Sequence, residues 1–225
     1  DALGIVWHLD DSRLTVQGRG LRGFTPPAAP LDCGNSATTI RLLAGALAAA
    51  GTPCTLDGSA GLRRRPMDRI TAPLLRMGVP ITSSDGCAPL TLAARAASHP
   101  LTAVDETLPV ASAQVKSCLI LAALAADGES TLREPGPSRD HTERMLAAMG
   151  ADIRVEGRAV TVAPLLQPLT PLRMTLPGDI SSAAFLLVAA ALVPGSELCV
   201  RDVGVNPTRT GILDVLREMG ARITV

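Results

Sequence analysis

The chain has 225 residues, of which 47% are apolar and 19% are charged, and its formal net charge is zero. This composition is typical of a globular protein with one or two hydrophobic cores, and the neutral balance gives no electrostatic reason to expect a nucleic-acid partner. No apolar run is long and unbroken enough to span a bilayer, so we expect no membrane role. The five cysteines lack a CxxC motif or metal-ligand spacing, which favours reduced thiols in a cytoplasmic protein.

A short pattern, a glycine followed by an apolar strand, recurs at Gly4, Gly78, Gly150 and Gly220 with spacings of 74, 72 and 70 residues. Each glycine stands where a helix would end in a left-handed residue. In the first three copies a polar turn and a returning strand follow, which predicts a β-hairpin. Between successive copies, the order of elements is strand, helix, strand, helix and hairpin. The sequence therefore predicts repeated β-α-β-α-β-β units.

In chain order, the first unit keeps only its hairpin. The second begins at Leu31, with helices expected over 38–50 and 67–77, a strand over 54–56 and its last strand ending at Leu92. The third has helices over 111–126 and 141–149, a strand over 130–132 and an end at Val162. The fourth begins near Leu172, with helices over 181–192 and 211–219 and a strand over 197–201. Because both ends of the chain fall inside a unit and residue 1 is not Met, we expect a fragment of a longer protein.

The helix starts carry residues that can bind anions. A strand at Leu31 runs through Gly34 and Asn35 into a helix whose first turn contains Ser36 and Thr38, and the backbone N–H groups and dipole of such a turn attract phosphate or carboxylate. Helix capping by Asn35 or Ser36 is the other interpretation of this step. Related signals recur elsewhere, at 63–65, 112–114 and 137–141. Together they favour one shared polyanionic ligand over capping alone.

All but one of the 21 basic residues are arginine, so phosphate or carboxylate binding would depend on guanidinium groups. The exception, Lys116, is expected on the surface of its helix. None of the three histidines is a candidate for acid–base catalysis: His8 falls in a hairpin, His99 precedes a proline and His141 opens a helix.

Five segments in order, residues 31–45, 65–67, 108–117, 134–145 and 178–184, resemble the 5-enolpyruvylshikimate-3-phosphate (EPSP) synthase family. The resemblance covers essentially the whole chain and implies an α/β fold of β-α-β-α-β-β units, an inside-out α/β barrel with six units in two domains. About three units are present here. It implies a first domain at residues 1–163 that lacks most of its first unit, and the start of a second domain at 164–225.

The resemblance also implies a reaction, the transfer of an enolpyruvyl group from phosphoenolpyruvate to the 5-hydroxyl of shikimate 3-phosphate with release of phosphate. No metal or organic cofactor is implied. By motif, the shikimate 3-phosphate residues are Ser112, Ala113, Gln114, Ser138 and Arg139, and the phosphoenolpyruvate residues are Asn35, Ala37, Thr38, Arg65 and Gln114. The roles of Asp179 and 181–182 stay open.

The chain departs from the family pattern in two places and lacks other parts of it. Ala37 replaces a glycine found in many members, and the added methyl predicts weaker inhibition by glyphosate, an analogue of phosphoenolpyruvate. Ala113 replaces the second serine of a Ser-Ser-Gln pattern, so one substrate contact is expected to be missing or made by water. The family's acid–base residues match nothing in the chain, so we expect the chain alone to be inactive.

Two other interpretations remain open. One is the related enolpyruvyl transferase that acts on UDP-N-acetylglucosamine, although its loop cysteine has no counterpart around 58–65. The other is a non-catalytic substrate-binding module, or half of a split enzyme whose missing ends come from a complementary chain.

Overall fold

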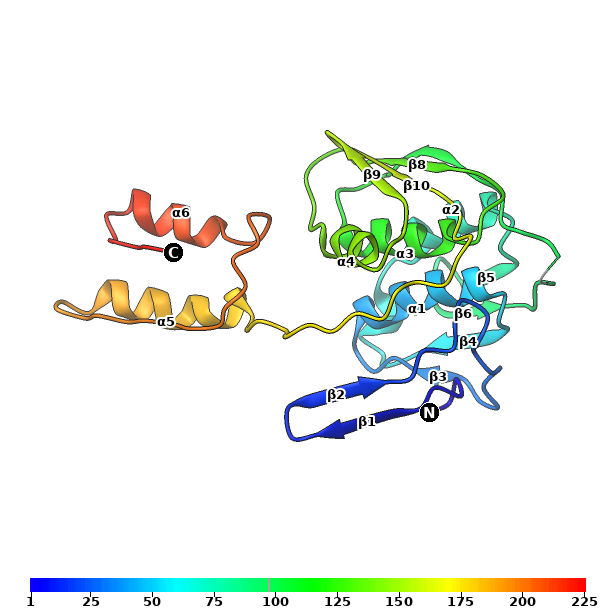
Figure 1. Cartoon of the computed structure of the whole chain (residues 1–225), viewed down its shortest axis with the longest axis horizontal. Helices are drawn as coiled ribbons and strands as arrows, with labels where there is room; N and C mark the ends of the chain where they lie inside the picture. Colours follow the sequence, from blue (N-terminus) through cyan, green and yellow to red (C-terminus); the bar gives the residue numbers. More distant parts are fainter. Residues whose placement is uncertain (97) are drawn as a thin grey trace. The chain divides into compact units, whose positions relative to one another are not determined.

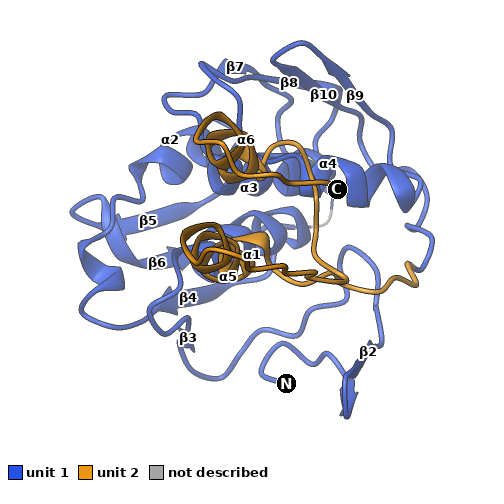
Figure 2. Ribbon diagram, turned by 90° about the vertical axis from the view of Figure 1, so that its left-hand side faces the viewer, with its two compact units in different colours: residues 1–171 blue, residues 172–225 orange. Residues whose placement is uncertain are grey.

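The computed structural model describes residues 1–96 and 98–225 (Figure 1). The chain forms two compact units, Asp1–Pro171 and Leu172–Val225 (Figure 2). The first extends beyond the domain end expected at residue 163, because the following segment stays attached to it: Leu165 N donates to Leu124 O at 2.8 Å and Thr170 N donates to Met149 O at 2.8 Å. That the two units correspond to the domains of an enolpyruvyl transferase stays a prediction.

The first unit contains two four-stranded sheets with the same topology. One has the order β3 (Leu31–Asp32), β4 (Cys54–Asp57), β6 (Cys87–Leu92), β5 (Ile81–Ser84), and the other has the order β7 (Asp105–Thr107), β8 (Ser130–Arg133), β10 (Ala159–Val162), β9 (Ile153–Glu156). In both, the first pair is parallel and the other two are antiparallel. The predicted β-α-β-α-β-β order is confirmed for the second and third units.

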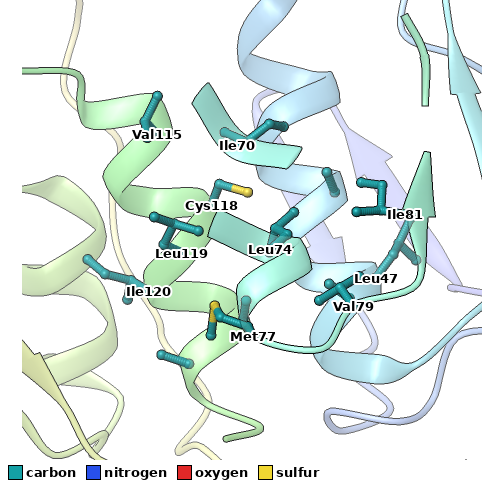
Figure 3. Close-up of a cluster of buried hydrophobic side chains, with 14 of the residues drawn as sticks. Leu47, Ile70, Leu74, Met77, Val79, Ile81, Val115, Cys118, Leu119 and Ile120 are labelled. Atoms are coloured by element: carbon teal, nitrogen blue, oxygen red, sulfur yellow. The ribbon is translucent and has the colours of Figure 1, made fainter. Parts of the chain in front are cut away.

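The helices of this unit lie between the two sheets (Figures 1 and 2). They are α1 (Ala37–Ala50), α2 (Asp68–Arg76), α3 (Ala113–Ala123) and α4 (His141–Ala148), and a 3-10 turn, η1 (Leu62–Arg64), precedes α2 along the chain. Side chains from three of them, including Leu47 of α1, Leu74 of α2 and Leu119 of α3, gather in one buried cluster (Figure 3). A helical layer enclosed by sheets is the inside-out arrangement that the resemblance implied.

Three of the four recurring glycines end helices as predicted; Gly4 is also left-handed, with φ 72°, but it follows a turn and not a helix. Gly78, Gly150 and Gly220 have φ values of 82°, 90° and 95°, the left-handed region in which a side chain would be strained. After each glycine the next N–H donates to a carbonyl five residues earlier, for example Val79 to Leu74 at 2.9 Å, which is a Schellman motif. The repeat thus has a physical basis at the end of α2, α4 and α6 (Gly211–Glu218).

The first hairpin is also present as predicted. Strands β1 (Trp7–Asp10) and β2 (Arg13–Val16) pair in antiparallel register, and Asp11 in the turn has φ 46°. All eight strand residues are exposed. A two-stranded sheet without a covering layer has little stability of its own.

The second unit contains two helices, α5 (Ile180–Leu192) and α6, whose buried residues Ile180, Ala183 and Leu213 form a small core. The prediction of strands near Leu172 and over 197–201 was wrong. Within the described part of this unit, the only strand-like pairing is one isolated bridge between Gly178 and Val203. An extended segment becomes a strand only when a neighbour completes its ladder of hydrogen bonds.

The surface position expected for Lys116 was also wrong, because this side chain is 2% exposed in the middle of the first unit. Two carboxylates compensate for the cost of burying its charge, since Nζ lies 2.7 Å from Glu134 Oε2 and 2.7 Å from Glu143 Oε1. In the described part of the chain, no helix combines the length and apolar character needed to cross a membrane.

Candidate functional site

The first turns of α1 and α3 lie next to each other. Near the helix starts, Gln114 Nε2 donates to Thr38 Oγ1 at 2.8 Å. One to two turns further along, Gly45 of α1 packs against the backbone of Cys118, so closely that a methyl group at Gly45 would fall 2.1 Å from Cys118 O. The two helices therefore run in the same direction. Their positive N-terminal ends point to one side of the molecule, as an anion site requires.

At the start of α1, the helix cap and the exposed hydroxyl that could meet an anion belong to different residues. Ser36 is the N-cap, and its Oγ accepts hydrogen bonds from Thr39 N at 3.1 Å and from Thr39 Oγ1 at 2.9 Å. The capping interpretation is therefore correct for Ser36. Thr38 is exposed, and because its hydroxyl oxygen accepts from Gln114, its own proton is free to be donated to an anion. The Asn35 side-chain oxygen accepts from Ser59 Oγ at 3.0 Å.

Arg41 connects the predicted site segments, although the sequence analysis had not selected it. Its Nη1 donates to Gln114 Oε1 at 2.6 Å and its Nη2 donates to Pro66 O at 2.9 Å. The residue is 8% exposed. Burial, followed by the nearby charges of Arg69 and Arg65, lowers the pKa of its guanidinium. One residue thus ties α1 to α3 and to the segment that carries Arg65.

A signal for Arg41 was present in the sequence. Helix α1 buries the stripe Ala37, Ile40, Arg41 and Ala44, the spacing of a core-facing helix surface. A charged residue within such a stripe requires buried partners. The stripe therefore predicts that Arg41 contacts polar groups inside the protein.

In the run of three arginines at 63–65, Arg63 and Arg65 differ in their contacts. Arg63 forms a two-point ion pair with Asp57, with its Nε 2.9 Å from Oδ1 and its Nη2 2.5 Å from Oδ2, and this pair lowers the pKa of Asp57. Arg65 is exposed, and within the described residues it has no ion-pair partner. Arg65 is therefore available to an external anion. Helix α2 begins at Asp68, two residues after Pro66.

The third repeat supplies the remaining predicted residues. Ser112 is the N-cap of α3 but makes no side-chain capping bond, which leaves its hydroxyl free for a ligand. Ser138 and Arg139 lie on the segment between β8 and α4. Arg139 is exposed. Ser138 Oγ is buried, and among the described residues it has no hydrogen-bond partner.

Two of the predicted residues need further comment. Ala37 is 4% exposed and belongs to the main hydrophobic cluster, so its methyl packs against protein at the base of the α1 turn. Ala113 is half-buried at the first position of α3. Ala37 precedes Thr38 and Ala113 precedes Gln114. The hydrogen bond between Thr38 and Gln114 joins the two helix starts.

Two of the buried cysteines, Cys54 and Cys118, have no catalytic environment. Burial raises the pKa of Cys118 to about 12 and that of Cys54 to about 11, so both remain neutral thiols near pH 7. Among the described residues there is no cluster of three histidine, cysteine, aspartate or glutamate side chains that could hold a metal ion.

The whole chain, residues 1–225, matches the family model described as EPSP synthase (3-phosphoshikimate 1-carboxyvinyltransferase). The chain belongs to the EPSP synthase family. A curated relative from Methylococcus capsulatus, named 3-phosphoshikimate 1-carboxyvinyltransferase, is 50% identical over 216 residues, which cover 96% of this chain and 48% of the relative. A relative of the same name from Halorhodospira halophila is 50% identical over 226 residues, with 100% and 50% covered.

A solved EPSP synthase from Acinetobacter baumannii has the same fold as this chain, with a TM-score of 0.90 and 40% identity over 100% of this chain and 50% of that chain. The inside-out α/β fold of the EPSP synthases is thereby confirmed. The chain spans about half the length of the curated relatives it matches. These matches favour the EPSP synthase family over the UDP-N-acetylglucosamine alternative.

Proposed function

We propose that this chain supplies the part of an EPSP synthase that binds shikimate 3-phosphate and one side of phosphoenolpyruvate, for transfer of the enolpyruvyl group to the 5-hydroxyl with release of phosphate. The observation that carries the proposal is the linkage of Thr38, Gln114 and the Arg65–Pro66 segment through Arg41. Family membership over residues 1–225 supports the choice of substrates.

In this proposal each group of residues has a separate task. For shikimate 3-phosphate the binding residues are Ser112, Ala113, Gln114, Ser138 and Arg139; for phosphoenolpyruvate they are Asn35, Ala37, Thr38, Arg65 and Gln114. Gln114 belongs to both sets. Its position between the two helix starts suits a residue that contacts both substrates at the point where they must meet.

The chemistry depends on bringing two anions together. Two helix N-termini and the guanidinium groups of Arg65 and Arg139 oppose the mutual repulsion of the substrates. The buried Arg41 adds positive potential beneath them without being exposed to solvent, where water would screen it. No residue of the chain is proposed as the acid–base catalyst, and no metal or organic cofactor is proposed.

Calorimetric titration of the 225-residue chain with shikimate 3-phosphate tests this proposal. We expect saturable binding that Arg139→Ala weakens at least about tenfold, since a charge-assisted hydrogen bond contributes about 1.5–3 kcal/mol. Arg13→Ala, in the exposed hairpin strand β2, is the matched control and should bind normally. Equal affinities for the Arg139 and Arg13 variants, or no binding by a chain that unfolds cooperatively, would contradict the proposal.

A further inference from the structure

Lys116 forms the centre of a buried group of three charges. Its side chain is 2% exposed, and those of its partners Glu134 and Glu143 are 7% and 4% exposed. Both Nζ to carboxylate distances are 2.7 Å. Burial lowers the pKa of Lys116, but the hydrogen bonds to the two carboxylates outweigh this and keep the pKa above its usual value. The side chain therefore stays a cation well above neutral pH.

The two glutamates lie on either side of the segment assigned to phosphate binding. Glu134 directly follows β8, and Glu143 is the third residue of α4. Ser138 and Arg139 lie between them. The ammonium of Lys116 thus holds both ends of this segment against α3, the helix that carries Ser112 and Gln114 on its first turn.

Two further contacts support the same segment. Ser117 Oγ, next to Lys116 on α3, lies 2.6 Å from Thr142 Oγ1 at the start of α4. Arg158 Nη1 donates to Pro135 O at 3.1 Å. Both are single hydrogen bonds at one end of the segment, whereas Lys116 is bound to both ends at once.

The charge balance makes the ammonium necessary for this arrangement. Glu134 Oε1 and Glu143 Oε2 are buried, and within the described residues they have no hydrogen-bond partner. Without Lys116, two carboxylates would remain buried with nothing to compensate them, and at least one would have to move toward water. Moving either end displaces Ser138 and Arg139. Stability alone does not require the ions, because packed apolar residues can replace a buried ion pair without loss.

We propose that Lys116 is a positioning residue, which fixes the location of Ser138 and Arg139 through Glu134 and Glu143 without touching the substrate. The proposal rests on the proposed function for what the segment binds. The positioning itself is a property of the unliganded chain. The two can therefore be tested separately.

The first experiment measures amide hydrogen exchange across the unliganded 225-residue chain. Lys116→Met keeps an unbranched side chain that is one heavy atom shorter and removes the charge. We expect faster exchange at residues 135–142 and unchanged exchange in β4 and β6 of the other sheet. Glu129→Gln is the matched control, because it removes one partner of an exposed ion pair with Arg154. Exchange that stays the same, or rises equally throughout the chain, would overturn the proposal.

A second variant covers the case in which Lys116→Met does not fold. Combining Lys116→Met with Glu134→Gln and Glu143→Gln removes all three charges, so no unpaired ion stays buried. We expect a melting temperature near that of the parent chain but faster exchange at residues 135–142. If both variants failed to fold, the three residues would serve folding alone and the proposal would be wrong.

The second experiment asks whether Lys116 acts through Arg139. The triple variant should bind shikimate 3-phosphate about ten- to one-hundredfold more weakly, the range expected when one charge-assisted hydrogen bond is lost. In an Arg139→Ala background the same three changes should cost less affinity than in the parent chain, because only the effect through Ser138 remains. Additive losses would contradict positioning. If the parent chain did not bind this ligand, the proposed function would lose its support, while the exchange result would still decide the positioning.

Discussion

The side-chain amide of Gln114 spans the first turns of two helices that are far apart in sequence, with its nitrogen 2.8 Å from Thr38 Oγ1 and its oxygen 2.6 Å from Arg41 Nη1. Both ends of the amide are therefore fixed by α1. A ligand bound at the start of α1 would therefore lie at a fixed position relative to a ligand bound at the start of α3. It also makes the buried Arg41 the support of the proposed site.

Replacing Arg41 with methionine should destabilise the first unit and weaken ligand binding. The change leaves Gln114 Oε1 and Pro66 O without their donor, which should lower the free energy of unfolding by about 3 kcal/mol. Urea unfolding checks the stability, and titration with shikimate 3-phosphate checks the binding. Arg69→Met removes a neighbouring arginine that is exposed on α2, and it should change stability little. Equal effects of the two substitutions would rule out a special role for Arg41.

The sequence predicted the repeats and the helix starts well because both depend on local chemistry. Gly78 and Gly150 adopt the left-handed conformation that their positions required, and the strands and helices of the second and third units follow one another along the chain in the predicted order. The prediction of a strand over 197–201 was wrong because strand formation depends on partners distant in sequence and not on local chemistry. Lys116 was misplaced because its carboxylate partners lie 18 and 27 residues further along the chain, beyond any helical spacing rule.

Gly45→Ala should separate α1 from α3. The added methyl would fall 2.1 Å from Cys118 O, and because that atom is backbone, one helix must move. Overpacking of this kind costs about 3 kcal/mol, and the shift should also break the bond between Thr38 and Gln114. Thermal unfolding and ligand titration check both effects. The control is Gly211→Ala at the start of α6, where nothing lies within 4 Å of the added methyl; a loss of similar size there would contradict the explanation.

Ala37→Gly should strengthen the binding of glyphosate to the chain saturated with shikimate 3-phosphate. Ala37 is 4% exposed in the first turn of α1. Removing its methyl leaves space into which this turn can move, and the movement makes room at Thr38 for glyphosate, which is longer than phosphoenolpyruvate. We expect a gain of about tenfold, the effect of relieving about 1.4 kcal/mol of crowding. Competition calorimetry against phosphoenolpyruvate measures it. Ala189→Gly, the same change at an exposed position of α5, is the control, and an Ala37→Gly chain that responds like the parent would refute the crowding.

The buried thiols should make the protein lose stability in alkali. Burial raises the pKa of Cys118 to about 12 and that of Cys54 to about 11, from 9.0 in an unfolded chain. Above pH 9.0 the unfolded state releases these protons while the folded state keeps them, so the stability that is present below this pH is lost progressively as the pH rises toward the folded values. The direction is the same for both thiols.

Between about pH 8 and pH 10 each thiol should reduce the free energy of unfolding by about 1 kcal/mol. Urea unfolding across this range measures the slope for the parent chain and for a chain carrying both Cys54→Ala and Cys118→Ala. The double variant should begin less stable, because Cys118 is fully buried and its removal leaves a cavity, but its stability should fall less steeply with pH. Cys199→Ala changes an exposed thiol and should leave the slope unchanged; parallel slopes for all three chains would show that the buried thiols do not control the alkaline transition.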